Sequence, residues 1–145
     1  MKNLLLLLFL VISIPAQSAD LVFELVNLKS DQGKVVLYLF PDLGQKSFPV
    51  KPEEGKPVCT VVSKILDSRA SIQCSNVPKG KYAAFAFHDE NENGEVDHHW
   101  YGPPKEAFGF SKNVEPLFGP PDFEETAFML THSHLSMTIR IRPFF

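Results

Sequence analysis

Short runs of β-branched and aromatic residues, each followed by Gly, Pro, Asn or Asp, recur along the chain and determine which class of fold it can adopt. No stretch of useful length shows the periodicity of an amphipathic helix. Seven such runs in 145 residues predict an all-β fold, a two-sheet antiparallel sandwich of about seven strands, with a closed barrel as the alternative. We expect the strands at residues 21–28, 34–40, 58–65, 69–73, 81–88, 126–130 and 135–142.

Neighbouring runs suggest how some strands pair. The turn at 30–33 favours a hairpin between the first two strands. In the fifth strand, Phe85 and Phe87 fall on one face and Ala84 and Ala86 on the other, which predicts tight packing of the alanine face against a second layer.

The first nineteen residues have the features of a signal peptide. Lys2 provides a positive start, residues 4–14 are almost entirely apolar, and small residues follow Pro15. Cleavage after Ser18 fits best. The alternative, a membrane anchor, is disfavoured because a bilayer requires roughly 20 apolar residues. We therefore expect an exported protein, periplasmic or secreted, with a single domain at 20–145.

The overall charge argues against one class of partner. Asp and Glu number 17 against 14 Lys and Arg, a formal net charge of −3. A mildly acidic chain lacks the basic surface that nucleic-acid binding requires, so we expect no nucleic-acid partner.

Two cysteines, Cys59 and Cys74, are the whole complement of the chain. In an exported protein an even count favours a disulfide. A hairpin with its loop at 65–68 would place Cys59 opposite Cys74, and closing a loop of this size is worth roughly 3 kcal/mol. Two free buried thiols are the alternative.

Residues 89–97 carry the most distinctive chemistry. Oxygen-bearing side chains stand at the first, third, fifth and ninth places, and Gly94 stands at the sixth. Calcium takes six to eight hard oxygens, which alternate residues of a wrapped loop can supply. The predicted ligands are the main-chain carbonyl of Glu95 and the side chains of Asp89, Asn91, Asn93 and Asp97.

This loop differs from an EF-hand, because its twelfth place is Trp100 instead of a bidentate glutamate. One ligand is missing, and water or the more distant Glu106 could supply it. Few charged ligands predict weak, structural binding, in the range of ~10⁻⁴ to 10⁻³ M. A solvated turn is the alternative, since Asn, Gly and Asp are ordinary turn residues.

Three histidines, His88, His98 and His99, surround the loop and raise a transition-metal alternative. On a strand, His98 and His99 would point to opposite faces, whereas zinc needs three or four converging ligands.

No nucleophile motif is present, and Glu106 with Asp97 is the one carboxylate pair that could act in catalysis. The sequence therefore favours a non-enzymatic protein.

Aromatic residues are concentrated after the loop, in residues 100–111. Rings on a rigid loop can form a platform for a sugar or a peptide. The interpretation we favour is a lid that folds back on the sandwich, because exposed aromatic patches are uncommon without a partner. The candidate platform residues are Trp100, Tyr101, Phe108 and Phe110.

Two motifs carry a family resemblance. Residues 77–82 resemble the Pro-x-Gly-x-Tyr turn of prealbumin-like domains, and the run from Tyr82 to Ser111 is similar to the signature of bacterial domain-of-unknown-function family 2141. The resemblance implies an exported bacterial protein with a prealbumin- or immunoglobulin-like sandwich and no established activity. The segment at 98–101 is atypical of that family.

Three functional hypotheses follow. The first is an exported binding module with a calcium-stabilised loop, whose partner is an envelope protein, a peptide or a carbohydrate. The second is a periplasmic metal-dependent hydrolase using Glu106 or the histidines. The third is a structural envelope component without a bound ion.

Overall fold

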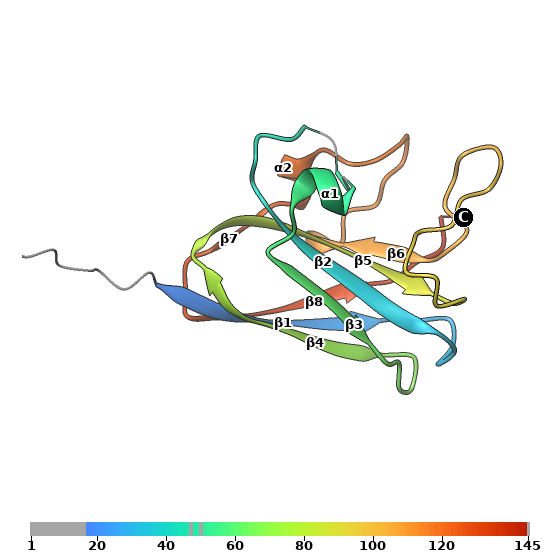
Figure 1. Cartoon of the computed structure of the whole chain (residues 1–145), viewed down its shortest axis with the longest axis horizontal. Helices are drawn as coiled ribbons and strands as arrows, with labels where there is room; N and C mark the ends of the chain where they lie inside the picture. The colour runs from blue at the N-terminus through green and yellow to red at the C-terminus, as the bar shows by residue number, and fades with distance from the viewer. Residues whose placement is uncertain (1–16, 47, 50, 145) are drawn as a thin grey trace, which may run out of the picture.

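The protein is an all-β sandwich of two sheets, as the sequence predicted. The computed structural model describes residues 17–46, 48–49 and 51–144. A three-stranded sheet packs against a five-stranded sheet (Figure 1). The first sheet has the order β4 (Ala70–Pro78), β1 (Ser18–Val26), β8 (His134–Arg140). The second has the order β3 (Cys59–Ser63), β2 (Lys34–Pro41), β5 (Gly80–Asp89), β6 (Phe108–Phe110), and β7 (Phe128–Leu130) also pairs with β5.

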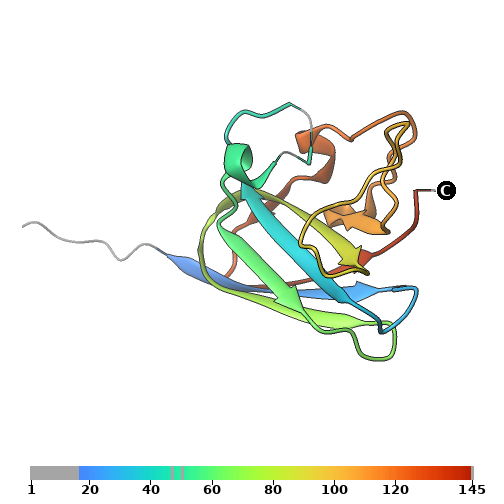
Figure 2. The same ribbon diagram turned by 45° about the vertical axis from the view of Figure 1, so that its right-hand side comes forward.

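Short helices lie on the outer side of the five-stranded sheet. These are α1 (Pro52–Gly55) and α2 (Phe123–Thr126), and a 3₁₀ turn, η1 (Ser111–Asn113), follows β6. Figures 1 and 2 show both α-helices on the side of this sheet that faces away from β1, β4 and β8. The five-stranded sheet is therefore covered on both faces.

The predicted signal peptide lies mostly outside the described residues. Its last two residues, Ser18 and Ala19, belong to β1, where Ala19 pairs with Val77 and is buried. Within the described ranges no helix is long and apolar enough to cross a membrane.

The predicted hairpin between the first two strands is wrong. β1 pairs with β4 antiparallel and with β8 parallel, whereas β2 pairs with β3 and β5 in the other sheet. The chain crosses between sheets after β1, beginning at Asn27 with a positive φ of 64°. The alternation of apolar residues shows which face of a strand is buried, but it does not show which strand lies beside it. Proximity in the sequence therefore led to the wrong strand pairing here.

The disulfide between Cys59 and Cys74 is present, but the hairpin predicted to create it is wrong. β3 and β4 belong to different sheets, and the bond joins those sheets with a Cα–Cα distance of 6.1 Å. The turn between them is held by Asp31, whose carboxylate accepts the backbone N–H groups of Asp67 and Ser68 at 3.0 and 2.7 Å.

β5 is the centre of the molecule, and its residues from Tyr82 to Asp89 are all buried. Its two faces serve different cores, as the alternation predicted. Ala84 and Ala86 belong to the core between the sheets, whereas Phe85 and Phe87 belong to a second, phenylalanine-rich core on the outer face.

β6 is a strand within residues 100–111, a segment that was predicted to be a loop. It has three residues, and Gly109 is the one that faces the other sheet. A Cβ at Gly109 would lie 2.5 Å from the carbonyl oxygen of Arg140 and 2.7 Å from a methyl of Ile139. Glycine is therefore required for β6 to approach β8, and the two flanking phenylalanines then face outward.

Removing the disulfide should weaken the sandwich. A Cys59→Ala/Cys74→Ala variant should lose roughly 3 kcal/mol of unfolding free energy, because a loop of this size is no longer closed in the unfolded chain. Urea denaturation of the wild type, with and without reductant, checks the effect: reduction should destabilise the wild type by a similar amount and leave the variant unchanged.

Adding a methyl group at Gly109 should be costly, whereas adding one elsewhere in the same sheet should not. Gly109→Ala should destabilise by about 1–3 kcal/mol through overpacking against backbone. Gly80→Ala is the matched control, because a Cβ there would meet only the Tyr82 ring at 3.4 Å. Equal thermal midpoints for the two variants would contradict the proposed contact between β6 and β8.

Candidate functional site

The predicted calcium loop begins where β5 ends. Asp89 is the last residue of the strand and is 2% exposed. Its two carboxylate oxygens accept the backbone N–H groups of Asn93 at 3.1 Å and Gly94 at 2.8 Å. Gly94 has a φ of 79°, a left-handed conformation that glycine adopts without strain. The chain therefore wraps around the Asp89 carboxylate.

The next side chains continue the wrapping. Asn91 Oδ1 accepts the N–H of Asn93 at 3.1 Å, and Asn93 Oδ1 accepts the N–H of Glu95 at 2.9 Å. The amide groups of Asn91 and Asn93 also donate to the two oxygens of Asp97, at 2.7 and 3.1 Å. The structure thus brings the four predicted side-chain ligands into one network, to which Glu95 contributes its backbone N–H.

Glu106 closes the loop. Its carboxylate accepts the N–H of Glu90 at 3.2 Å and the N–H of Asp97 at 3.3 Å, so it joins the beginning and the end of the loop. Glu106 is 5% exposed. Burial raises its pKa, the two backbone hydrogen bonds oppose that rise, and the nearby charges of Asp89 and Asp97 add to it.

The two remaining glutamates of the loop's first half point outward. Glu92 forms an ion pair with Lys34 at 2.7 Å, and Glu90 lies 3.6 Å from Lys29. Both pairs are exposed and contribute little to stability. They leave the inner oxygens of the loop to Asp89, the two asparagines and Asp97.

The histidines occupy separate environments. His88 is fully buried, with Nε2 2.7 Å from the carbonyl of Gln32. His98 is exposed, and His99 stacks on Tyr101 with ring centroids 4.9 Å apart. Across the described ranges, no three or more His, Cys, Asp or Glu side chains are arranged to hold a metal ion. A calcium site here would depend on amide and main-chain oxygens in addition to Asp89 and Asp97.

A groove lies over the outer face of the five-stranded sheet beside this loop. Its floor consists of two rows of side chains across β2, β5 and β6. The strand register places Tyr38, Phe85 and Phe110 in one row, and Phe87 beside Phe108 in the other. Ring contacts link all five, with centroid distances from 5.4 to 6.5 Å.

Three loop segments form the walls of the groove, which has a volume of ≈ 1080 Å³. They are residues 49 and 51–53, residues 94–104 and residues 116–120. The second of these overlaps the calcium-type loop at Gly94, Glu95 and Val96. A single stretch of backbone therefore belongs to both parts of the candidate site.

The four platform residues divide into two pairs. Phe108 and Phe110 are buried strand residues that line the groove floor. Trp100 is 96% exposed and Tyr101 is 56% exposed, so the favoured interpretation, a lid folded onto the sandwich, does not describe them. They stand at the tip of the loop, and of the two Tyr101 lines the groove.

Sequence reasoning missed the facing wall. Leu117 and Phe118 are 79% and 102% exposed, and their neighbours Pro116 and Gly119 line the groove. The sequence signal for this wall was a pair of apolar residues, Leu117 and Phe118, between Pro116 and Gly119 in a polar loop. Pro116, Gly119 and Pro120 therefore form an apolar part of the groove wall, and the exposed Leu117 and Phe118 are their neighbours in the chain.

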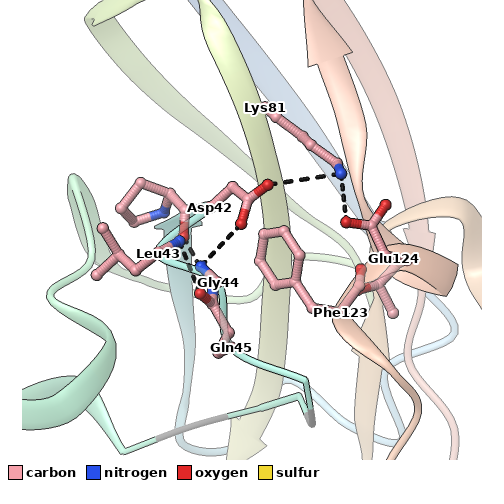
Figure 3. Close-up of polar contacts among 9 residues, drawn as sticks. Asp42, Leu43, Gly44, Gln45, Lys81, Phe123 and Glu124 are labelled. Carbon is pink, nitrogen blue, oxygen red and sulfur yellow. Dashed lines mark hydrogen bonds and ion pairs between the residues drawn. The ribbon is translucent and has the colours of Figure 1, made fainter.

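At the other end of β5, a charged cluster ties two of the covering segments to the sheet. Figure 3 shows the ammonium group of Lys81 between the carboxylates of Asp42 and Glu124. Asp42 follows β2 and also accepts the N–H of Gly44 at 3.0 Å, whereas Glu124 is in α2. The hydrogen bond to Glu124 is the main cause of the raised pKa of Lys81.

The titration of Glu106 should appear in the pH dependence of stability. A raised pKa in the folded state means that its contribution is fully present below the ordinary value of 4.5 and is lost as the pH rises through the folded-state pKa. The unfolding free energy of the wild type, relative to Glu106→Gln, should therefore fall as the pH rises above 4.5. Denaturation in chelator measures it. Glu54→Gln, on exposed α1, should show no such trend, and a pH-independent difference for Glu106→Gln would contradict the prediction.

The comparison with protein families agrees with the resemblance noted in the sequence. A family described as "Uncharacterized protein conserved in bacteria (DUF2141)" matches residues 24–138, a range that contains the loop and the groove floor. No curated protein and no solved structure matches the chain. Because the match covers well over half of the 145 residues, the chain belongs to this bacterial family.

Proposed function

We propose that this protein is an exported, non-enzymatic binding module whose ligand occupies the ring-floored groove, with calcium holding the 89–97 loop that forms part of its wall. The groove is the observation that carries the proposal. Ligand sites in proteins are typically concave and largely apolar, with volumes of about 300–1,000 Å³. This groove has ≈ 1080 Å³ and a floor of five linked aromatic rings.

The loop supports the calcium part of the proposal. The side-chain oxygens of Asn91 and Asn93 each accept one backbone N–H, and a carbonyl oxygen has a second lone pair to offer. Hard oxygens of this kind suit calcium, and weak binding suits a structural role. An ion would fix residues 94–96, and through them one wall of the groove.

Glu106 provides a physical connection between the loop and the groove. Its carboxylate joins the N–H groups of Glu90 and Asp97, and the segment between Asp97 and Glu106 includes the exposed rings of the groove wall. An ordered loop therefore restrains this wall, whose internal backbone hydrogen bonds include Lys105 N–H to the carbonyl of Asp97 and His99 N–H to the carbonyl of Pro103.

Calcium should raise the thermal midpoint of the domain. At 10 mM calcium and a Kd near ~10⁻⁴ M, stabilisation should reach about 2.7 kcal/mol. Asp97→Asn should abolish most of it, because the change removes a carboxylate ligand and leaves the backbone contacts of Asp89 in place. Glu92→Gln is the charge-matched control in the same loop, where the carboxylate points toward Lys34, and it should retain the calcium response.

Magnesium and chelator complete that measurement. Magnesium needs near-octahedral coordination at shorter distances, so it should stabilise less than calcium. Equal midpoints with calcium, magnesium and chelator would reject the calcium part of the proposal and favour a structural protein with no bound ion.

An uncharged apolar dye tests the groove independently. Nile red should bind the folded domain with an increase in fluorescence, because the floor rings offer an apolar surface. Tyr101→Ala should weaken binding, whereas Met129→Ala, which removes an exposed apolar side chain outside the groove, should not. Absence of any dye binding to the folded protein would reject the groove as a ligand site.

A further inference from the structure

Charged side chains give the groove lining a net negative formal charge. Its lining includes the carboxylates of Glu53 and Glu95 and the ammonium group of Lys51, together with His98. Glu53 belongs to α1 and Glu95 to the calcium-type loop. The two carboxylates therefore stand on different walls, and the lining carries more negative than positive formal charge.

That negative potential reaches the floor. The hydroxyl group of Tyr38 has a raised pKa, mainly because it is partly buried, and then because of the charges of Glu53, Asp89 and Glu95. Three carboxylates thus act on one floor residue, those of Glu53 and Glu95 from the groove walls and that of Asp89 from the end of β5. Lys51 is exposed, and a strongly hydrated lysine at such a position neutralises a rim carboxylate only in part.

The rings add to this effect. The face of an aromatic ring carries partial negative charge and attracts a cation placed above it. Tyr38 and Phe87 are stacked at 6.5 Å, and Phe85 and Phe87 at 6.0 Å, so neighbouring ring faces have similar orientations. Ring faces and rim carboxylates favour the same ligand charge.

We propose that the groove binds a small organic cation, an ammonium group carried on an apolar body. The inference depends on the proposed function, since it names the ligand class of the same groove. The ammonium group lies over the floor rings within reach of the potential of Glu53 and Glu95. The apolar body extends over the apolar lining residues Tyr101 and Pro116, which water would otherwise cover.

A pair of ligands with the same shape but different charge tests whether the groove prefers a cation. Choline and 3,3-dimethylbutan-1-ol have nearly the same shape and differ by a quaternary nitrogen in place of a carbon. Titrations of ¹⁵N-labelled protein, at fixed calcium, should show choline binding about tenfold tighter, as expected for a desolvated cation–ring contact. A benzyl-substituted choline should bind tighter again through its apolar body.

Matched variants locate the effect. Glu53→Gln and Glu95→Gln should each weaken choline binding roughly threefold, as expected for a single partly exposed charge, and leave the neutral alcohol unchanged. Glu54→Gln is the control, since Glu54 is the next residue of α1, is exposed and does not line the groove. All three changes alter exposed side chains, so folding should be preserved.

The outcomes separate the two proposals. Equal binding of choline and its neutral isostere, alongside normal Nile red binding, overturns the cation inference and leaves the binding groove standing. Tighter binding of the neutral isostere overturns it as well. Failure of every probe, the dye included, overturns both. If the preference for choline is unchanged in both Glu53→Gln and Glu95→Gln, the cation binds outside this groove. That result also overturns the inference.

Discussion

The structure depends on one strand that is buried on both faces. β5 contributes alanines to the core between the sheets and phenylalanines to the core beneath the outer loops. Small side chains on the inner face let the two sheets approach, and large rings on the outer face provide a surface that loops and two short helices must cover. The loops cover it incompletely, and the uncovered part is the groove. Burial of apolar area drives both layers, so the candidate site is a by-product of how this strand is stabilised.

The pattern of residues predicted the fold class and most strands, because alternation along a strand records which face is buried. It did not predict which strands are neighbours. β1 joins a parallel pairing with β8, a contact between residues more than a hundred positions apart that local sequence cannot encode. The disulfide was predicted correctly from the cysteine count and wrongly from register, since Cys59 and Cys74 meet across the sandwich instead of within a sheet.

The candidate site was predictable where chemistry is local. The oxygen spacing of 89–97 indicated a wrapped loop, and the hydrogen bonds of Asp89, Asn91 and Asn93 form one. The sequence predicted Glu106 as a distant sixth ligand or a catalytic carboxylate, whereas in the structure it closes the loop through two backbone N–H groups. The groove itself was out of reach, because its floor combines residues of three strands whose register only the folded structure provides.

The shared stretch Gly94–Val96 has a thermodynamic consequence. Where one piece of backbone serves two binding sites, the occupancy of one changes the affinity of the other, and linkage makes the two changes equal in size. An ion that orders this stretch in advance removes part of the ordering cost that a groove ligand would otherwise meet. By the same reciprocity, a ligand held in the groove would raise the affinity of the proposed ion site by the same factor, in calcium-poor surroundings as well.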